Sequence, residues 1–276
     1  MRLKPSCFNL NMFLRVFFLS FLISWNVQSE DDVPSPQPVT VYAASSLTAA
    51  FEDMKEPFQF QNPGIAITLS FGGSQQLRTQ LELGARADLY VAADERQMIL
   101  AQKSGIVREA SELFAQNTLI VILPNQNSAK IEALQDLAKP GIKIVLAAPE
   151  VPVGNYSRLF LEKAAQQSAF PTDYKERVLA NVVSEEPNVK QVAAKVQLDE
   201  ADAGIVYGTD LTPEVAGKLK RLEIPAELNQ LASYYIAVTK TCPEPKAAGK
   251  FIEFILAEPG QKILSNHGFI RVPKHH

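Results

Sequence analysis

Two patterns alternate along most of the chain. Short uncharged stretches rich in valine, isoleucine and leucine are typical of buried strands, and stretches whose apolar residues recur at helical spacing follow them. The stretch Val39–Phe51 shows both patterns, because its first half is apolar and β-branched and its second half, from Ser45 or Ser46 onward, has helical spacing. Strands that alternate with helices predict an α/β fold with a mainly parallel sheet covered by helices.

The pattern predicts two series of strands and helices. The first series has strands at residues 39–44, 65–71 and 88–94, with helices ending near residues 60, 83 and 103. The second has strands at 117–123, 143–147, 182–183 and 203–207, with helices at 131–138, 152–167, 174–180 and 188–198. A strand at 231–238 and helices at 246–257 and 260–266 follow, and they are too few to form a further series of their own.

This order predicts two lobes, with the chain crossing out near Leu123 and back near Tyr234. We expect lobe 1 to comprise residues 39–122 plus 235–276, and lobe 2 to comprise residues 123–234. Residues 30–38 are acidic and rich in proline, which is typical of a disordered leader.

The first 29 residues have the pattern of a secretory signal peptide. Basic residues precede an apolar run from Val16 to Trp25, and small residues flank a cleavage site at Val27-Gln28-Ser29. The run is much shorter than the ~20 residues that span a bilayer. We therefore expect residues 1–29 to be removed on export and the mature protein to be periplasmic.

Charge and cysteine content narrow the class of function. The chain has 27 basic and 30 acidic residues, for a net charge of −3, and no basic stripe. A nucleic-acid partner is therefore not expected. Cys242 is the only cysteine after the signal peptide, so no intramolecular disulfide can form in the exported chain.

Serine hydrolysis is the main enzymatic alternative. Gly72-Gly73-Ser74-Gln75-Gln76 nearly matches the G-x-S-x-G nucleophile elbow but lacks its last glycine. A serine nucleophile needs a base, and the three histidines all lie near the C-terminus (His267, His275 and His276). The same shortage of histidine and cysteine argues against a zinc site, so no cofactor and no direct metal ligand is expected. An exported hydrolase using Ser74 remains the less favoured alternative to a non-enzymatic protein.

Neutral hydrogen-bond donors follow several predicted strands. Ser46 and Ser74 open helices, and so do the segments around Val153 and Val189. Tyr207 ends a buried strand. In open α/β sheets ligands bind beyond the carboxyl ends of the strands, and a helix N-terminus favours an anion there. Each residue alone could be a helix cap, a turn or a core side chain.

The segments that carry these donors resemble those of the periplasmic molybdate-binding proteins of ABC importers, from about Val39 to Arg271. The matching segments, in order, are Ala43-Ala44-Ser45-Ser46-Leu47, Phe71-Gly72-Gly73-Ser74, Ala87–Asp94, Val151–Tyr156, Asn188–Gln191 and Gly204–Gly208. The resemblance implies a two-lobed periplasmic-binding-protein fold of type II with the ligand in the cleft. It also implies a monomer that delivers its ligand to the membrane permease of an ABC importer.

Matched residue by residue, the resemblance implies five ligand-binding residues for molybdate or tungstate: Ser46, Ser74, Val153, Val189 and Tyr207. The serines would use hydroxyl and backbone N–H groups, the valines their backbone N–H groups, and Tyr207 its hydroxyl. Gly73 stands where some relatives carry serine, a change expected to alter affinity only slightly. Another oxyanion such as sulfate remains an alternative ligand, because its charge and shape are alike.

Overall fold

The computed structural model describes residues 36–273, so the predicted signal peptide and most of the predicted leader lie outside the described residues. The first strand, β1 (Gln37–Ala44), includes the last two residues of that leader. The N–H of Gln37 donates to the carbonyl of Gly64 at 2.9 Å, which ties the start of β1 to the turn before β2 (Ile65–Gly72).

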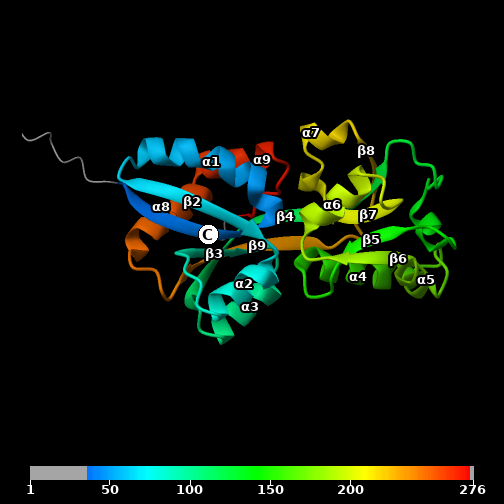
Figure 1. Cartoon of the computed structure of the whole chain (residues 1–276), viewed down its shortest axis with the longest axis horizontal. Coiled ribbons are helices and arrows are strands. Elements are labelled where there is room, and N and C mark those ends of the chain that lie inside the picture. The colour runs from blue at the N-terminus through cyan, green and yellow to red at the C-terminus, as the bar shows by residue number, and fades with distance from the viewer. Residues whose placement is uncertain (1–35, 274–276) are drawn as a thin grey trace, which may run out of the picture. The chain divides into compact units, whose positions relative to one another are not determined.

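The first sheet has the strand order β2-β1-β3-β9-β4, with β3 at Leu89–Ala92, β9 at Leu231–Thr239 and β4 at Val107–Pro124. The pairs of β1 with β2 and β3 are parallel, whereas β9 pairs antiparallel with both of its neighbours. Helices α1 (Thr48–Gln61), α8 (Pro245–Leu256) and α9 (Glu258–Asn266) cover one face, and α2 (Ser74–Glu82) and α3 (Glu95–Lys103) cover the other (Figure 1). We call these helices, together with β1, β2, β3 and β9, the first half.

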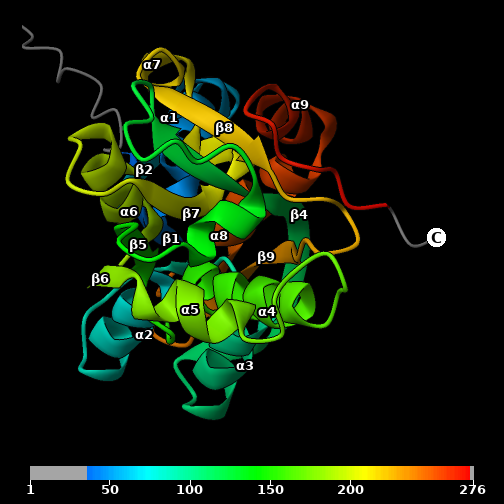
Figure 2. The same cartoon turned by 90° about the vertical axis from the view of Figure 1, so that its right-hand side faces the viewer.

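The second sheet has the order β4-β7-β5-β6, and β8 pairs with the other edge of β4. Its strands are β5 (Ile144–Ala147), β6 (Val182–Glu186), β7 (Ala203–Tyr207) and β8 (Leu219–Glu223). Helix α6 (Val189–Gln197) lies on one side of β5 and β7, and α4 (Pro152–Ala165) and α5 (Tyr174–Ala180) lie on the other (Figure 2). With the short helix α7 (Pro213–Ala216), these elements form the second half.

The alternation of β1 separates two apolar cores in the first half. Val39, Val41 and Ala43 are buried in the core that contains the aromatic residues of α1 and α8, where Phe58 and Phe251 meet edge to face at 5.0 Å. Tyr42 points to the opposite face, where the buried residues of α2 and α3 form a smaller core. Successive strand residues point to opposite faces, so one apolar strand supports helices on both sides of the sheet.

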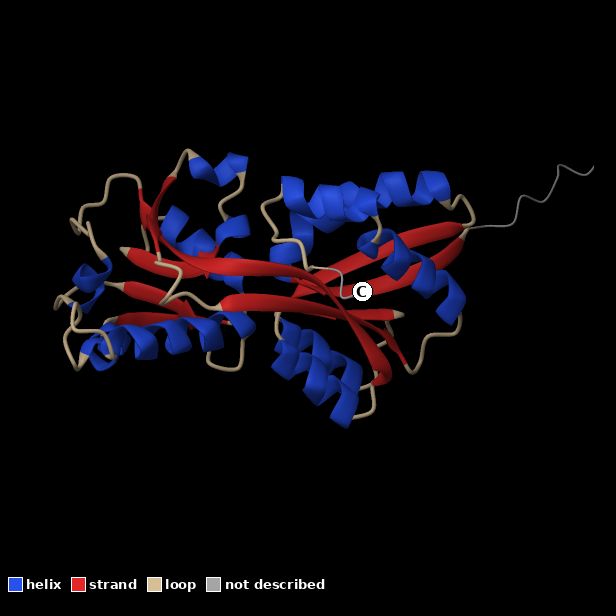
Figure 3. Ribbon diagram, turned by 180° about the vertical axis from the view of Figure 1, so that it is seen from behind, coloured by secondary structure: helices blue, strands red, loops and turns tan. Residues whose placement is uncertain are grey.

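Two long strands connect the halves (Figure 3). The segment Val107–Thr118 of β4 pairs with β9 in the first sheet, and Leu119–Pro124 pairs with β7 and β8 in the second. In β4 the chain therefore passes from the first sheet to the second between Thr118 and Leu119. The lobe boundaries at 122/123 and 234/235 remain a prediction.

Most predicted elements are present, and three differences are informative. The strand expected at 117–123 begins ten residues earlier, at Val107, because the polar residues that obscure it lie on an exposed edge paired with β9. The helix expected at 131–138 is only a 3-10 helix, Leu134–Ala138. The short elements β8 and α7 were not predicted, since neither carries a long periodic pattern.

Candidate functional site

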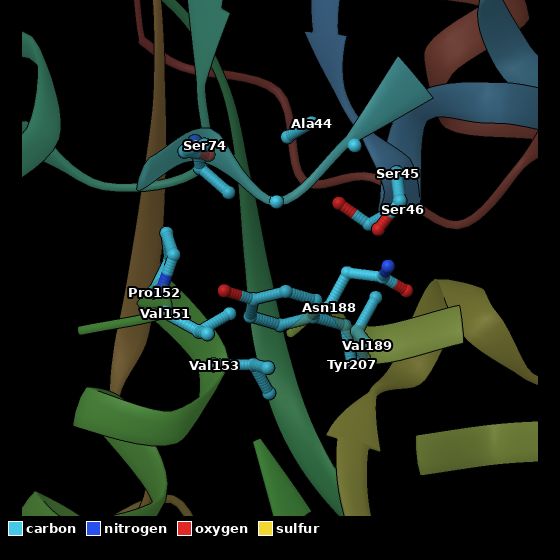
Figure 4. A pocket seen from close by; sticks show the side chains of 13 residues that line it. Ala44, Ser45, Ser46, Ser74, Val151, Pro152, Val153, Asn188, Val189 and Tyr207 are labelled. Atoms are coloured by element: carbon cyan, nitrogen blue, oxygen red, sulfur yellow. The ribbon is translucent and has the colours of Figure 1, made fainter. Parts of the chain in front are cut away.

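All five candidate residues line one small cavity between the two halves. Ser46 lies in the 3-10 turn Ser45–Leu47 that leads into α1, and Ser74 is the first residue of α2. Val153 and Val189 lie in the first turns of α4 and α6, and Tyr207 ends β7. Figure 4 shows the serines on one side of the cavity and the two valines with Tyr207 facing them from the other.

The cavity is small, with a volume of about 10 Å³, close to the volume available to one water-sized sphere. The lining residues are almost completely buried, with exposed fractions of 5% for Ser46, 3% for Val189 and 1% for Ser74, Val153 and Tyr207. Such a space admits one small compact ligand and excludes nucleotides, sugars and peptides.

Four chain segments point the starts of helices at this cavity. The first N–H groups of a helix have no acceptor within the helix, and the helix dipole adds partial positive charge there. Pro152 occupies the first position of α4, as expected, because its ring has no N–H to leave unpaired. Asn188 caps α6, since its Oδ1 accepts from the N–H of Gln191 at 3.1 Å.

Ser46 does not cap the first helix, which was one alternative that the sequence left open. The turn Ser45–Leu47 starts after Ala44 and α1 starts after Leu47, and neither start has a side-chain cap. The Ser46 hydroxyl instead lies 2.9 Å from the hydroxyl of Tyr234. Its position at the cavity is therefore set by a contact with a strand far along the chain.

The Ser74 hydroxyl is oriented by a backbone group. Its Oγ accepts a hydrogen bond from the N–H of Ala93 at 3.1 Å. An N–H group can only donate, so the hydroxyl hydrogen of Ser74 remains available to a ligand. The same residue is held from behind, since the hydroxyl of Tyr90 donates to the Ser74 carbonyl at 2.9 Å.

The Tyr207 hydroxyl is buried and has no hydrogen-bond partner among the described residues. A buried polar group without a partner is costly, so this hydroxyl points to an acceptor supplied by a ligand. Burial, with added effects of Tyr234, Tyr156 and nearby carboxylates, raises the pKa of Tyr207 well above its ordinary value. The hydroxyl is therefore a donor throughout the neutral and mildly alkaline range.

An ion pair between buried Asp210 and partly exposed Lys190 lies behind Tyr207. Asp210 accepts from the N–H of Tyr207 at 3.2 Å, and its other oxygen lies 3.2 Å from the ammonium of Lys190. Lys190 is the second residue of α6, so the pair ties the start of α6 to the end of β7. Burial raises the pKa of Asp210, and Lys190 opposes that rise.

None of the cavity-lining residues is charged, and none is a histidine or cysteine. The donors are hydroxyl and backbone N–H groups, which can hold an oxyanion but offer Ser74 no base. His267 is engaged elsewhere, with its Nε2 2.8 Å from a carboxylate oxygen of Asp53. Within residues 36–273 no cluster of three or more potential metal ligands occurs. The geometry therefore does not favour the hydrolase alternative.

Hydrogen bonds join the two halves at the rim of the cavity. The Gln75 side chain donates to the carbonyl of Pro187 at 2.8 Å, and Gln97 donates to that of Glu150 at 2.9 Å. Arg96 also donates to the carbonyl of Glu150, at 2.9 Å. These donors were missed in the sequence, because a polar residue in the first turn of a helix has no distinctive pattern.

Gly73 also belongs to this rim. An added Cβ there would lie 2.3 Å from the carbonyl oxygen of Pro187, closer than any real contact allows. Glycine permits this approach of the two halves. The sequence predicted only a slight effect on affinity from the residue at this position. The structure shows that the space at Gly73 also limits which residues fit there.

An α/β fold with two sheets, a small cavity between them and neutral donors at four helix starts defines a class of protein that binds a solute. The chain belongs to the bacterial extracellular solute-binding protein family, whose model matches residues 39–270. This confirms the predicted fold class, a periplasmic-binding-protein fold of type II.

Among its relatives is the molybdate-binding protein ModA of Mycobacterium tuberculosis, which is 34% identical over 233 residues and 84% of each chain. The substrate-binding domain of a putative molybdenum ABC transporter from Clostridium difficile is 28% identical and has a TM-score of 0.62, covering 86% of this chain and 99% of its own. The sulfate-binding protein SubI of M. tuberculosis is 19% identical, with a TM-score of 0.76 over 86% and 87% of the two chains, which shows a shared fold. The resemblance to molybdate-binding proteins is confirmed. In the described part of the chain, helices are too short or too polar to cross a membrane.

Proposed function

We propose that this protein binds molybdate or tungstate in the cavity and delivers it to the membrane permease of an ABC importer. The observation that carries the proposal is the buried Tyr207 hydroxyl, which lacks a partner among the described residues and lines a cavity ringed by helix starts. The similarity to molybdate-binding relatives supports the choice of anion.

The proposed ligand contacts use neutral donors only. Ser46 and Ser74 would donate through their hydroxyl and backbone N–H groups, Val153 and Val189 through backbone N–H groups, and Tyr207 through its hydroxyl. A buried dianion needs several donors to replace its hydration, and hydrogen bonds to a charged group are stronger than neutral ones. A lining of donors also disfavours protonated anions, because their O–H groups would find few acceptors.

Sulfate is the second candidate ligand, because the sulfate-binding protein SubI has a similar fold. Sulfate and molybdate are both tetrahedral dianions, so a neutral set of donors separates them mainly by size. The small cavity can distinguish sulfate from molybdate by size only if its lining residues keep their positions when the ligand binds.

Calorimetry of the purified protein with molybdate, tungstate and sulfate tests the ligand. We expect 1:1 binding of molybdate or tungstate and much weaker binding of sulfate. Tight sulfate binding would support the second candidate instead. Absence of binding with both metal oxyanions would exclude the proposed ligand.

Delivery and location are the remaining parts of the proposal. Export by the predicted signal peptide would place the protein in the periplasm as a monomer, where the closed form would dock on the permease. Uptake of labelled molybdate by cells with and without the protein measures delivery. Equal uptake at low molybdate concentration would contradict it.

A further inference from the structure

The hydroxyl of Ser46 is the end of a buried chain of polar groups. Its Oγ lies 2.9 Å from Oη of Tyr234, which lies 3.4 Å from Nδ2 of Asn117. The same Nδ2 donates to Oγ1 of Thr209 at 2.8 Å. Tyr234 and Asn117 are almost completely buried, with exposed fractions of 0% and 2%.

One backbone group fixes the orientation of the Asn117 amide. The N–H of Thr118 donates to Oδ1 of Asn117 at 2.9 Å, which identifies the oxygen of that amide and directs its NH₂ group toward Tyr234 and Thr209. Tyr234 Oη therefore accepts from Asn117. Either hydroxyl can donate in the contact between Tyr234 and Ser46. If Tyr234 donates to Ser46 Oγ, the Ser46 hydrogen is left for the cavity.

The second serine of the cavity has the same arrangement. The N–H of Ala93 donates to Ser74 Oγ and leaves the Ser74 hydrogen available. At Ser46 the corresponding donor is a side chain, so a single substitution can remove it. The two serines come from different strand–helix junctions of the first half, which makes the shared arrangement informative.

We propose that Tyr234, held by Asn117, is a positioning residue that donates to Ser46 and thereby directs the Ser46 hydroxyl hydrogen at the bound oxyanion. The proposal rests on the proposed function. A donor oriented before binding does not have to reorganise when the anion arrives. Successive hydrogen bonds in one direction also polarise one another and strengthen the last donor.

These buried polar groups also link the Ser46 hydroxyl to the strands that connect the two halves. Tyr234 lies on β9 and Asn117 on β4, the two strands that connect the halves, and Thr209 follows Tyr207 by two residues. The donor from the first half is thus aligned by groups on both connecting strands. A change in their relative position would also change the direction of the Ser46 hydroxyl.

A purely structural role for Tyr234 predicts a different result. Its ring packs edge to face against Phe269 at 5.3 Å and Phe114 at 6.3 Å, and is tilted against Tyr207 at 5.9 Å. Phenylalanine keeps all three ring contacts and removes only the hydroxyl. Tyr234→Phe therefore separates the positioning role from the packing role.

The test is a double-mutant cycle for molybdate affinity, measured by calorimetry on wild type, Tyr234→Phe, Ser46→Ala and the double variant. We expect Tyr234→Phe to weaken binding about 3- to 30-fold in the wild-type background, because both its hydrogen bond and the alignment of Ser46 are lost. In the Ser46→Ala background we expect an effect below about twofold. Tyr174→Phe is the matched control, since the Tyr174 hydroxyl is also buried and donates to the Leu134 carbonyl in the second half.

Two outcomes overturn the inference while leaving the proposed function in place. One is an effect of Tyr234→Phe below twofold, and the other is an equal loss in both backgrounds. Wild type that binds neither molybdate nor tungstate would refute the proposed function and this inference together. If Tyr234→Phe does not fold, Asn117→Ser removes the donor to Tyr234, and its effect should likewise depend on Ser46.

Discussion

At the scale of single residues, the site depends on polar atoms whose bonding is incomplete within the protein. The Ser74 hydroxyl accepts from the N–H of Ala93 and keeps its hydrogen, whereas the Tyr207 hydroxyl has no partner in the described part of the chain. An unpaired buried hydroxyl destabilises the ligand-free protein. The Tyr207 hydroxyl is therefore expected to strengthen ligand binding and to lower the stability of the ligand-free protein.

Tyr207→Phe should weaken oxyanion binding by ~1–3 kcal/mol, because a donor to a charged ligand is lost. The same change should leave the unfolding free energy of the ligand-free protein unchanged or higher, since no bond within the protein is broken. Calorimetry and chemical denaturation measure the two quantities.

The matched control for Tyr207→Phe is Tyr174→Phe. This change breaks the 2.6 Å bond to the Leu134 carbonyl and should lower stability by ~1 kcal/mol without affecting affinity. If Tyr207→Phe instead lowered stability and left affinity intact, Tyr207 would be a core residue.

At the scale of elements, two loops bring backbone N–H groups to the cavity and are held there by side chains of the first half. Gln75 in α2 bonds the carbonyl before Asn188, and Gln97 in α3 bonds the carbonyl before Val151. The loops before α4 and α6 are thus held in place by the side chains of Gln75 and Gln97, which do not line the cavity themselves. Such bonds would keep the closed form closed.

Gln75→Met should raise the dissociation rate of the oxyanion several-fold, because it removes a cross-half hydrogen bond worth ~1 kcal/mol but keeps the side chain's size. Stopped-flow measurement with a competing anion gives the rate. Gln102→Met is the control, since Gln102 donates to the Glu109 carbonyl within the first half. Equal rates for both variants would show that the Pro187 contact does not hold the closed form.

Gly73→Ala should weaken binding at least about tenfold, because its Cβ would lie 2.3 Å from the Pro187 carbonyl when the halves are together. Ligand-free stability should change little, as the halves can separate. Scattering with and without ligand should show a less complete compaction. Gly64→Ala is the control, because its added Cβ meets nothing within 4 Å. Affinity equal to wild type would mean that the loop containing Pro187 moves to accommodate the added Cβ at little cost in free energy.

At the scale of the whole molecule, the chain has a net charge of −3, and the proposed anion site has no charged lining residue. Long-range attraction would therefore not explain the proposed binding, and the donors would have to act at short range in a site shielded from water. A charge-free lining also removes groups that would titrate near neutrality.

Molybdate affinity should change less than twofold between about pH 7 and about pH 9. Burial raises the pKa of Tyr207 and also that of Tyr234, so both hydroxyls stay protonated above the pH at which an ordinary tyrosine ionises. A lowered pKa would have the opposite effect, with affinity falling as the hydroxyl lost its proton. Calorimetry across this pH range measures the affinity. A steep fall in affinity with rising pH would reveal a titrating group in contact with the ligand.

Much of the fold could be predicted because its signals are local. The elements α5 and β7 have the bounds expected from the sequence, and the alternation of strands and helices predicted the class of fold. The first part of β4 and the whole of β8 were missed, since their residues are held by pairing with distant strands rather than by their own pattern.

For the site, the sequence by itself determined which residues could act: neutral donors placed after strands and at the starts of helices. Their assembly around one cavity was decided by tertiary structure. Ser46 and Tyr234 are 188 residues apart and bond at 2.9 Å, and the Gly73–Pro187 approach spans the two halves. Local propensity sets where a helix begins, because that depends on neighbouring residues. The direction of a hydroxyl and the closeness of two loops depend on packing between distant segments, which only the folded chain establishes.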